Sequence, residues 1–265
     1  MRPTTNIAVR AARAAGKLLL RYYGQVDGGS ISEKGRNDFV SEVDRAAEAA
    51  IIDIIRKAYP SHAILAEESG AHAGDDFQWV IDPLDGTTNY LHGFPQFSVS
   101  IALMHRGQLE SAVVYDPLRE EMYTADRGGG AFLNDRRIRV TQRKDLHGAL
   151  LGTGIPFRDQ RYLDTYLSMM KALIRDTAGI RRPGSAALDF AYVAAGRIDG
   201  FWELGLAAWD FAAGVLLVRE AGGVVSDLAG GDRHLETGNV VAAGIKLHAA
   251  MLREIRPLLP PELPA

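Results

Sequence analysis

The chain contains 265 residues, of which 47% are hydrophobic and 24% are charged, and it has a formal net charge of −3. This balance is that of an ordinary soluble globular protein, and no Lys- or Arg-rich run indicates a dedicated nucleic-acid binder. The absence of cysteine excludes disulfides, thiolate catalysis and cysteine-based zinc sites, and no run approaches the roughly 20 apolar residues that a membrane span needs. We therefore expect a cytoplasmic protein.

Two helices are predicted before the first strands. An apolar stripe predicts a helix over Thr5–Tyr23, with Gly24 as its stop. The polar, glycine-containing segment Asp27–Asp38 predicts a mobile loop. A second helix is expected to follow Ser41 and to end before Pro60.

Short strands then dominate, and Pro83 is expected to stop the second of them because it lacks a backbone donor. The turn His105–Gln108 predicts a hairpin between the third and fourth strands. The predicted strands are 63–66, 77–81, 97–104, 109–115, 121–125 and 130–133.

After about residue 147 strands alternate with helices. The predicted helices are 162–174, 185–195, 210–221 and 246–259, and the predicted strands are 150–152, 198–202, 223–226 and 240–243. We interpret the chain as an α+β lobe over about 1–146 and an α/β lobe over about 147–265. Because no Pro/Ser-rich linker separates the lobes, residues 1–265 are expected to form one compact unit.

The segment Asp82–Asn89 carries the strongest chemical signal. Asp82 and Asp85 lie three residues apart at the end of a predicted buried strand, so both can point at one spot. Hard cations such as Mg²⁺ prefer oxygen ligands of this kind. Gly86 permits a tight turn, and the amides of Gly86, Thr87 and Thr88 at a helix start would bind a phosphate oxygen. The alternative is an Asp-Pro-x-Asp-Gly turn in which Asp85 merely caps that helix.

Four further acidic residues have ordinary explanations when each segment is taken alone. Glu67 and Glu68 follow a predicted strand and would usually be a solvated surface pair. Asp210 opens an apolar helix and would usually be its N-cap. Asp44 ends Ser41-Glu42-Val43-Asp44, which matches a capping box. No single one of these elements decides between a structural and a chemical role.

Taken together, these residues resemble the inositol monophosphatase family of Mg²⁺-dependent, Li⁺-sensitive phosphatases, and the bacterial inositol-1-monophosphatases most closely. The resemblance covers essentially the whole chain. It implies a layered αβαβα sandwich of the inositol monophosphatase and fructose-1,6-bisphosphatase type. The matching segments are Asp82-Pro83-Leu84-Asp85-Gly86-Thr87-Thr88-Asn89, Trp209-Asp210-Phe211-Ala212-Ala213-Gly214, Glu67-Glu68-Ser69 and Asn37–Asp44.

The resemblance also implies roles for individual residues. Glu67, Asp82 and the carbonyl of Leu84 correspond to ligands of a first Mg²⁺, and Asp82, Asp85 and Asp210 to ligands of a second. Glu67 would also serve a weaker third site, and Mn²⁺ is a possible substitute.

Asp44 and Thr87 correspond to the pair that orients or deprotonates the attacking water, and Lys34 to a lid position. Glu203 corresponds to the acceptor of substrate hydroxyls. The segment Gly184-Ser185-Ala186 corresponds to the inositol pocket.

The implied reaction is Mg²⁺-dependent hydrolysis of myo-inositol monophosphate by a homodimer. Neighbouring branches of the family use fructose 1,6-bisphosphate, histidinol phosphate or adenosine 3′,5′-bisphosphate, so these substrates remain alternatives. Some bacterial relatives bind transcription-elongation proteins, which leaves an interaction role open. Arg181 and Arg182 could contact phosphate or lie at a dimer interface, and we favour the interface.

Overall fold

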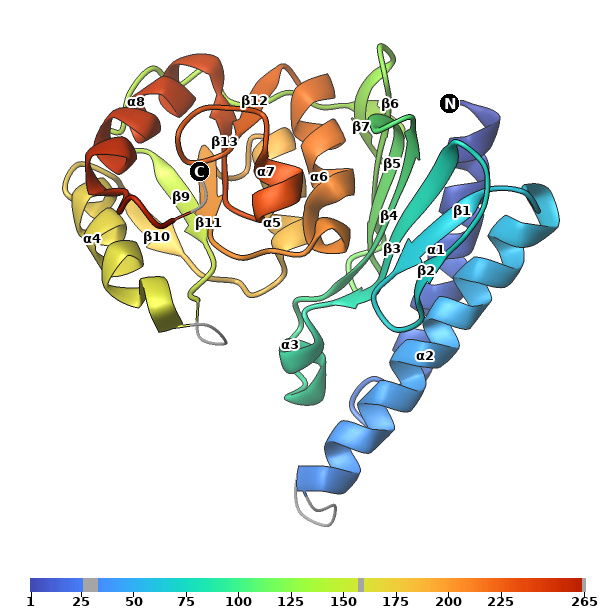
Figure 1. The fold of residues 1–265 in the computed structure, drawn as a ribbon. Helices are drawn as coiled ribbons and strands as arrows, with labels where there is room; N and C mark the ends of the chain where they lie inside the picture. The colour runs from blue at the N-terminus through green and yellow to red at the C-terminus, as the bar shows by residue number, and fades with distance from the viewer. Residues whose placement is uncertain (26–32, 157–159, 264–265) are drawn as a thin grey trace.

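The chain folds into five alternating layers of helices and sheets (Figure 1). The computed structural model describes residues 1–25, 33–156 and 160–263, and it describes residues 33–41 by their backbone alone. Helices α1 and α2 cover one face of an eight-stranded sheet, and α5 and α6 lie between that sheet and a five-stranded sheet. Helices α4 and α8 cover the outer face of the second sheet. The predicted layered αβαβα sandwich is therefore confirmed.

The first two helices pack against each other along small side chains. Helix α1 (Pro3–Tyr22) buries Ala8, Ala11 and Ala15, which lets α2 (Glu33–Ala58) approach closely. Helix α1 begins two residues earlier than predicted because Pro3 occupies its first turn, where no backbone donor is needed.

Helix α2 begins well before the predicted start at Ser41, so residues 33–38 are helical and the loop prediction is wrong there. Gly35 and the polar residues of this segment suggested a loop, but a single glycine costs a helix only about 1 kcal/mol relative to Ala. The rest of the predicted loop, before residue 33, lies largely outside the described residues.

The eight-stranded sheet has the order β2-β1-β3-β4-β5-β6-β7-β8. Strand β1 pairs with β3 in parallel, and the other neighbouring pairs are antiparallel. The β4–β5 turn contains Arg106 and Gly107, both with positive φ, as a two-residue hairpin of type I′ requires. The strands are β1 (Ala63–Ala66), β2 (Gly70–His72), β3 (Phe77–Asp85), β4 (Ser98–His105), β5 (Gln108–Asp116), β6 (Glu121–Asp126), β7 (Gly130–Leu133) and β8 (Arg136–Arg137).

Strand β3 continues through Pro83, which contradicts the prediction that this proline stops it. The β3–β4 register shifts between Asp82 and Asp85, so Pro83 lies at a bulge where its missing N–H breaks no ladder bond. The bulge leaves both aspartates inside the strand and still turns their side chains toward the middle of the molecule.

The second sheet has the order β10-β9-β11-β13-β12, with β9 parallel to both β10 and β11. Its strands are β9 (Leu150–Thr153), β10 (Gly179–Arg181), β11 (Gly200–Glu203), β12 (Gly223–Ser226) and β13 (Val240–Gly244). The helices of this half are α4 (Leu163–Ile174), α5 (Ala186–Ala194), α6 (Ala208–Glu220), α7 (His234–Thr237) and α8 (Ile245–Ile255). Sequence analysis missed β2, β8, β10 and α7, which are too short to show a period.

Three apolar clusters fill the spaces between the layers. On β4, Val99 and Ile101 face α1 and α2, whereas Ala102 faces α5 and α6. Each sheet is thus buried on both faces, which explains why its central strands are apolar almost without interruption. Among the described helices, none has both the length and the apolar composition to cross a membrane. That residues 1–265 form one compact unit stays a prediction.

The contact between α5 and α6 generates a stability prediction. A Cβ placed on Gly214 of α6 would lie 2.4 Å from the Cβ of Phe190 on α5. Gly214→Ala should therefore push the two helices apart and lower the free energy of unfolding by about 1–3 kcal/mol. Thermal denaturation measures this change, and an unaltered or higher Tm would contradict the close packing.

Candidate active site

A cavity of about 350 Å³ opens between the two sheets, where ends of β1, β3, β9 and β11 meet the starts of α5 and α6. Its wall contains every residue predicted to bind a metal or the substrate, whereas Asp44 is not part of the wall. These lining residues are Glu67, Asp82, Leu84, Asp85, Gly86, Thr87, Thr88, Gly184, Ser185, Ala186, Glu203 and Asp210.

Asp82 and Asp85 hold their positions through backbone amides. Asp82 is 1% exposed, and its Oδ1 accepts a hydrogen bond of 2.9 Å from the amide of Leu84. The carbonyl of Leu84 accepts a bond of 3.0 Å from the Thr87 hydroxyl. The bulge in β3 and the turn after it are therefore fixed by the same side chains that carry the predicted chemistry.

Asp85 caps a helix of the other half of the molecule. Its Oδ2 accepts hydrogen bonds from the Ser185 hydroxyl at 2.5 Å and from the amide of Ala187 at 2.8 Å. Ser185 is the N-cap of α5, and Ala187 lies in its first turn, where backbone N–H groups lack partners inside the helix. The interpretation that Asp85 caps the helix directly after it is therefore wrong.

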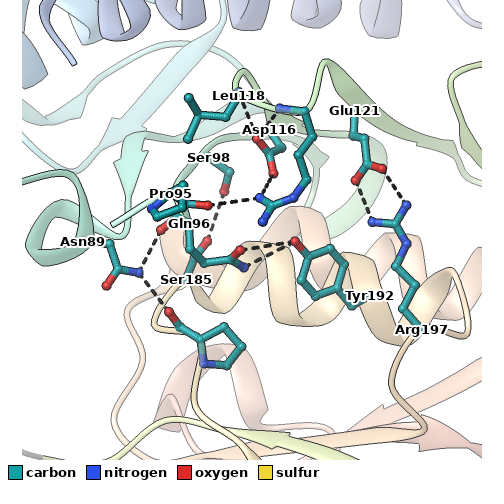
Figure 2. A network of polar contacts seen from close by, with 12 residues as sticks. Asn89, Pro95, Gln96, Ser98, Asp116, Leu118, Glu121, Ser185, Tyr192 and Arg197 are labelled. Atoms are coloured by element: carbon teal, nitrogen blue, oxygen red, sulfur yellow. Dashed lines mark hydrogen bonds and ion pairs between the residues drawn. The ribbon is translucent and has the colours of Figure 1, made fainter. Parts of the chain in front are cut away.

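Asn89 also joins the two halves. Its side-chain amide nitrogen lies 2.8 Å from the carbonyl oxygen of Gln96 and 2.9 Å from that of Pro183. Figure 2 shows these contacts together with the neighbouring pair Ser98 and Ser185, whose hydroxyl oxygens are 3.4 Å apart. The last residue of the Asp82–Asn89 segment thus fixes the chain that leads into α5.

Gly86 occupies a position that suits glycine alone. Its φ is +94°, and a Cβ there would lie 2.9 Å from the carbonyl oxygen of Gln96. Helix α3 (Thr87–Leu91) begins directly after it, as predicted, although it is only five residues long. Gly86, Thr87 and Thr88 border the cavity beside the aspartates.

Glu67 follows the last residue of β1, and Glu48 holds the next turn in place. The two carboxylate oxygens of Glu48 accept the amides of Glu68 at 2.8 Å and of Ser69 at 2.9 Å. Glu48 is 3% exposed and lies one helical turn after Asp44 on α2. Sequence reasoning missed it, although its spacing of four residues from Asp44 could have indicated a shared helix face.

Asp44 lies inside α2 rather than at its start, so the capping-box interpretation is wrong. Its side chain is 3% exposed, and its Oδ1 has no hydrogen-bond partner among the described residues. Burial raises the pKa of Asp44 to about 8, with further contributions from the charges of Glu67, Glu68 and Glu48. A buried carboxyl with an unused oxygen is costly to the fold, which points to a chemical role.

Asp210 is the third residue of α6, not its N-cap, and its Oδ2 accepts the amide of Ala207 at 2.7 Å. Glu203 ends β11, and its carboxylate rests on Gly154, where any Cβ would collide with it. Burial raises the pKa of Glu203 to about 8, and the charges of Asp210 and Asp85 add to this increase.

Burial and neighbouring carboxylates raise the pKa of both aspartates on β3. Burial has the largest effect on the pKa of Asp82, which lies well above its usual range, and the charges of Glu67, Asp85, Asp210 and Asp44 raise it further. Burial also raises the pKa of Asp85, to about 7, although the hydrogen bond from Ser185 opposes the change. Without a cation, ionising these carboxyls together is therefore unfavourable.

This donor set fits a hard divalent cation. All predicted ligands are oxygens, and a cation would remove the repulsion that burial creates. The side chains stand apart, however, since no three acidic or histidine side chains among the described residues are spaced to hold an ion as they are. Asp85 and Asp210 each give one oxygen to a backbone amide, so small side-chain rotations would have to accompany binding.

The segment before α5 and the end of β11 also belong to the wall of the cavity. Gly184, Ser185 and Ala186 line it beside the turn after β3, where Ser185 donates to Asp85, and Glu203 lines it from β11. Arg182 also lines the cavity and lowers the pKa of Glu203, so this arginine has a place at the site that the preferred interface interpretation did not include. Asp189, which sequence reasoning did not single out, belongs to the same wall.

The raised pKa values predict how metal and pH act on stability. The folded-state pKa is about 7 for Asp85 and about 8 for Asp44 and Glu203, against about 4 in unfolded chains. The folded state therefore binds more protons, so the free energy of unfolding of the metal-free protein falls as pH rises from about 4 through about 8. Burial lowers the pKa of His234 and His248 to about 4, so these histidines make the free energy of unfolding rise with pH. That rise is nearly complete by about pH 7, because histidines in unfolded chains have then lost most of their protons.

Thermal denaturation should show that the Tm of the metal-free protein is lower at about pH 8.5 than at about pH 7. Millimolar Mg²⁺ should raise the Tm, and by more at the higher pH, because the cation replaces the protons. The Asp82→Asn variant should show a smaller rise of Tm on addition of Mg²⁺ than the wild-type protein. A melting curve that Mg²⁺ leaves unchanged would contradict the carboxylate site.

Comparisons with known proteins agree on one family. The model of the inositol monophosphatase family matches residues 1–259. The chain is 57% identical to the Nus factor SuhB of Pseudomonas aeruginosa, and the alignment covers 99% of both proteins.

Solved structures give the same result. The extragenic suppressor protein suhB of Bartonella henselae superposes with a TM-score of 0.90 at 45% identity, covering 96% of this chain and 99% of that one. The inositol monophosphatase of Anabaena has a TM-score of 0.83 at 38% identity, covering 98% and 97%. The fold, the motifs and these similarities together show that the chain belongs to the inositol monophosphatase family, a family of generally Mg²⁺-dependent phosphatases.

Proposed function

We propose that this protein hydrolyses myo-inositol monophosphate to myo-inositol and phosphate, with Mg²⁺ as its cofactor and Mn²⁺ as a substitute. The observation that carries the proposal is one cavity whose wall suits both parts of this substrate. Its carboxylates and the turn Gly86–Thr88 would serve the phosphate, and Glu203 would accept hydroxyls of the alcohol. The 38% identity to a structure described as an inositol monophosphatase supports the same substrate.

We assign the metal ligands as the motifs imply. One Mg²⁺ would be held by Glu67, Asp82 and the Leu84 carbonyl. A second would be held by Asp82, Asp85 and Asp210, and a weaker third by Glu67. Bound Mg²⁺ would supply charge neutralisation for the anionic ester, a lowered pKa of water and stabilisation of the departing alkoxide. The raised pKa values of Asp82 and Asp85 support this assignment because only a cation or a proton can offset such repulsion.

The phosphate would lie against the turn between β3 and α3. The amides of Gly86, Thr87 and Thr88 would donate to its oxygens, and the φ of +94° at Gly86 gives the backbone its close approach. In the reaction the water oxygen forms a bond to phosphorus while the ester P–O bond breaks. The inositol oxygen leaves as an alkoxide and takes up a proton.

We assign Asp44 and Thr87 to the orientation and deprotonation of the attacking water. The Thr87 hydroxyl donates to the Leu84 carbonyl and so keeps its lone pairs available to accept from a water molecule. Asp44 lies outside the cavity wall, beside the charge of Glu67. Its unused Oδ1 and its raised pKa, about 8, suit a group that receives a proton.

The proposal predicts that carboxylate loss abolishes phosphate release. Asp82→Asn and Asp210→Asn should each lower kcat/KM with Mg²⁺ by about a hundredfold or more, since even indirect metal contacts contribute about 10–100-fold. Asp164→Asn, on the exposed face of α4, is the matched control and should retain wild-type turnover. Full turnover by both site variants would exclude the assigned metal ligands.

The substrate is tested in the same assay by comparing kcat/KM values across a panel. Myo-inositol 1-phosphate should exceed fructose 1,6-bisphosphate, histidinol phosphate and adenosine 3′,5′-bisphosphate. A higher value for any of the other three would reassign the protein to another substrate within the family.

A second function is favoured by the name of a relative. A protein 57% identical over 99% of both chains is named a Nus factor. We infer that this chain also binds transcription-elongation proteins, as a homodimer, through a surface that needs no catalysis. The phosphatase site and such a surface are compatible in one molecule.

Binding and turnover can be separated with a catalytically inactive variant. Asp82→Asn should bind purified transcription-elongation factors with the wild-type Kd, because that side chain is buried and cannot touch a protein partner. Biolayer interferometry measures the affinity. Absence of binding by the wild-type protein would exclude the interaction role and leave the phosphatase proposal intact.

A further inference from the structure

Asp189 is a buried carboxyl in the cavity wall that the assigned reaction does not use. It lies in the first half of α5 and is 1% exposed. Its Oδ1 has no hydrogen-bond partner among the described residues, although buried polar groups are nearly always paired. A carboxyl retained for stability would be paired, so the position of this one requires another explanation.

Asp189 and Glu203 both lie near the end of β9. Gly154, the residue directly after this strand, leaves room for Glu203, because a Cβ there would collide with the Glu203 carboxylate. A Cβ on Gly152, the third residue of β9, would lie at an ordinary contact distance of 3.7 Å from the Oδ1 of Asp189. The two acidic groups are therefore neighbours at this end of the strand.

Both acidic groups line the cavity. Each has a raised pKa to which the charge of Asp85 contributes and which Arg182 partly lowers. Glu203 is also the largest charge acting on Asp189. Asp189 and Glu203 are therefore near each other, near Asp85 and near the guanidinium of Arg182, as expected for two groups that contact a single small ligand.

We propose that Asp189 is a specificity-determining residue that hydrogen-bonds a second hydroxyl of the substrate alcohol, beside the hydroxyl bound by Glu203. This inference rests on the proposed function and specifies its substrate class. The ligand is a cyclic polyol phosphate with at least two free hydroxyls on one side of the ester. An alcohol without those hydroxyls would leave the buried carboxyl of Asp189 unpaired and would therefore bind poorly.

The electrostatics of Asp189 agree with contact to an uncharged hydroxyl. Burial raises the pKa of Asp189 well above its usual range, and the charges of Glu203 and Asp85 act in the same direction. A neutral carboxyl both donates and accepts, as a hydroxyl does. Asn has the same shape with one acceptor and two donors, so it should replace Asp189 far better than an apolar residue of similar volume.

Two variants of Asp189 test the assignment. Asp189→Leu removes all hydrogen bonding, and Asp189→Asn keeps it. With saturating Mg²⁺, kcat/KM is measured for myo-inositol 1-phosphate and for p-nitrophenyl phosphate, which lacks free hydroxyls. Asp164→Leu, the same exchange at an exposed position of α4, is the matched control.

The ratio of the two kcat/KM values should fall about tenfold or more in Asp189→Leu and should recover to within a fewfold of wild type in Asp189→Asn. The Tm of Asp189→Leu should rise, because an unpaired buried carboxyl is lost. An unchanged ratio, or equal failure of Asn and Leu, would overturn the assignment. If Asp189→Leu does not fold, the Asn variant together with Asp189→Ala gives the same comparison.

A binding measurement tests the role of Asp189 independently of the proposed phosphatase activity. Calorimetry of myo-inositol binding in the presence of Mg²⁺ and inorganic phosphate needs no turnover. Weaker binding to Asp189→Leu than to wild type would support the hydroxyl contact even if another phosphate ester proves to be the substrate. Equal binding to both proteins would refute it even if the wild-type protein hydrolyses myo-inositol 1-phosphate.

Discussion

The hydrogen bonds between Asp85 and the first turn of α5 hold the site together. Asp85 belongs to β3 of the eight-stranded sheet, whereas Ser185 and Ala187 lie about 100 residues later, beside the five-stranded sheet. One carboxylate thus accepts a side-chain hydroxyl and a backbone amide at the start of a distant helix, and Asn89 reinforces the connection through the carbonyls of Gln96 and Pro183. These contacts add to the apolar packing of α5 and α6 between the two sheets and fix the cavity wall where the two halves meet.

The same connection concentrates negative charge. Asp85 cannot reach α5 without standing near Asp82 and Asp210, and burial then raises the pKa of the aspartates on β3. Such a cluster opposes folding in the absence of a cation. Proteins retain unfavourable groups of this kind chiefly where they serve chemistry. The cost to stability and the capacity to bind a divalent cation are therefore two results of one arrangement.

A glycine provides the space for Glu203. Gly154, directly after β9, lies where the Glu203 side chain of β11 enters, and a Cβ at this position would collide with that carboxylate. Glu48 illustrates the same dependence at the metal end, because it orders the turn after β1 by accepting two amides. Residues outside the recognised motifs thus set the geometry in which the motifs act.

The sequence by itself determined the family, the layered fold and the residues of the motifs. Apolar runs identified most of the longer helices and strands because each sheet is buried on both faces, and the acidic motifs identified the cavity wall because each motif is a continuous segment of the chain. Short elements such as β10 were missed, since three residues show no period. The predicted strand end at Pro83 and the capping-box alternative for Asp44 failed because a bulge and a longer helix, both set by neighbouring elements, overrode local rules.

Only the tertiary structure decided which distant residues meet. The alternative to a metal role for Asp85 was a cap on the helix beside it, and Asp85 caps α5 instead, because hydrogen bonds to backbone donors depend on proximity in space and not on order in the chain. Asp189 looked like an ordinary helical residue until its burial, its unpaired oxygen and its place beside Glu203 were visible. The sequence specifies the reactive groups, whereas packing between the layers specifies their surroundings. Those surroundings determine the pKa of each group, its exposure and its hydrogen-bond partners.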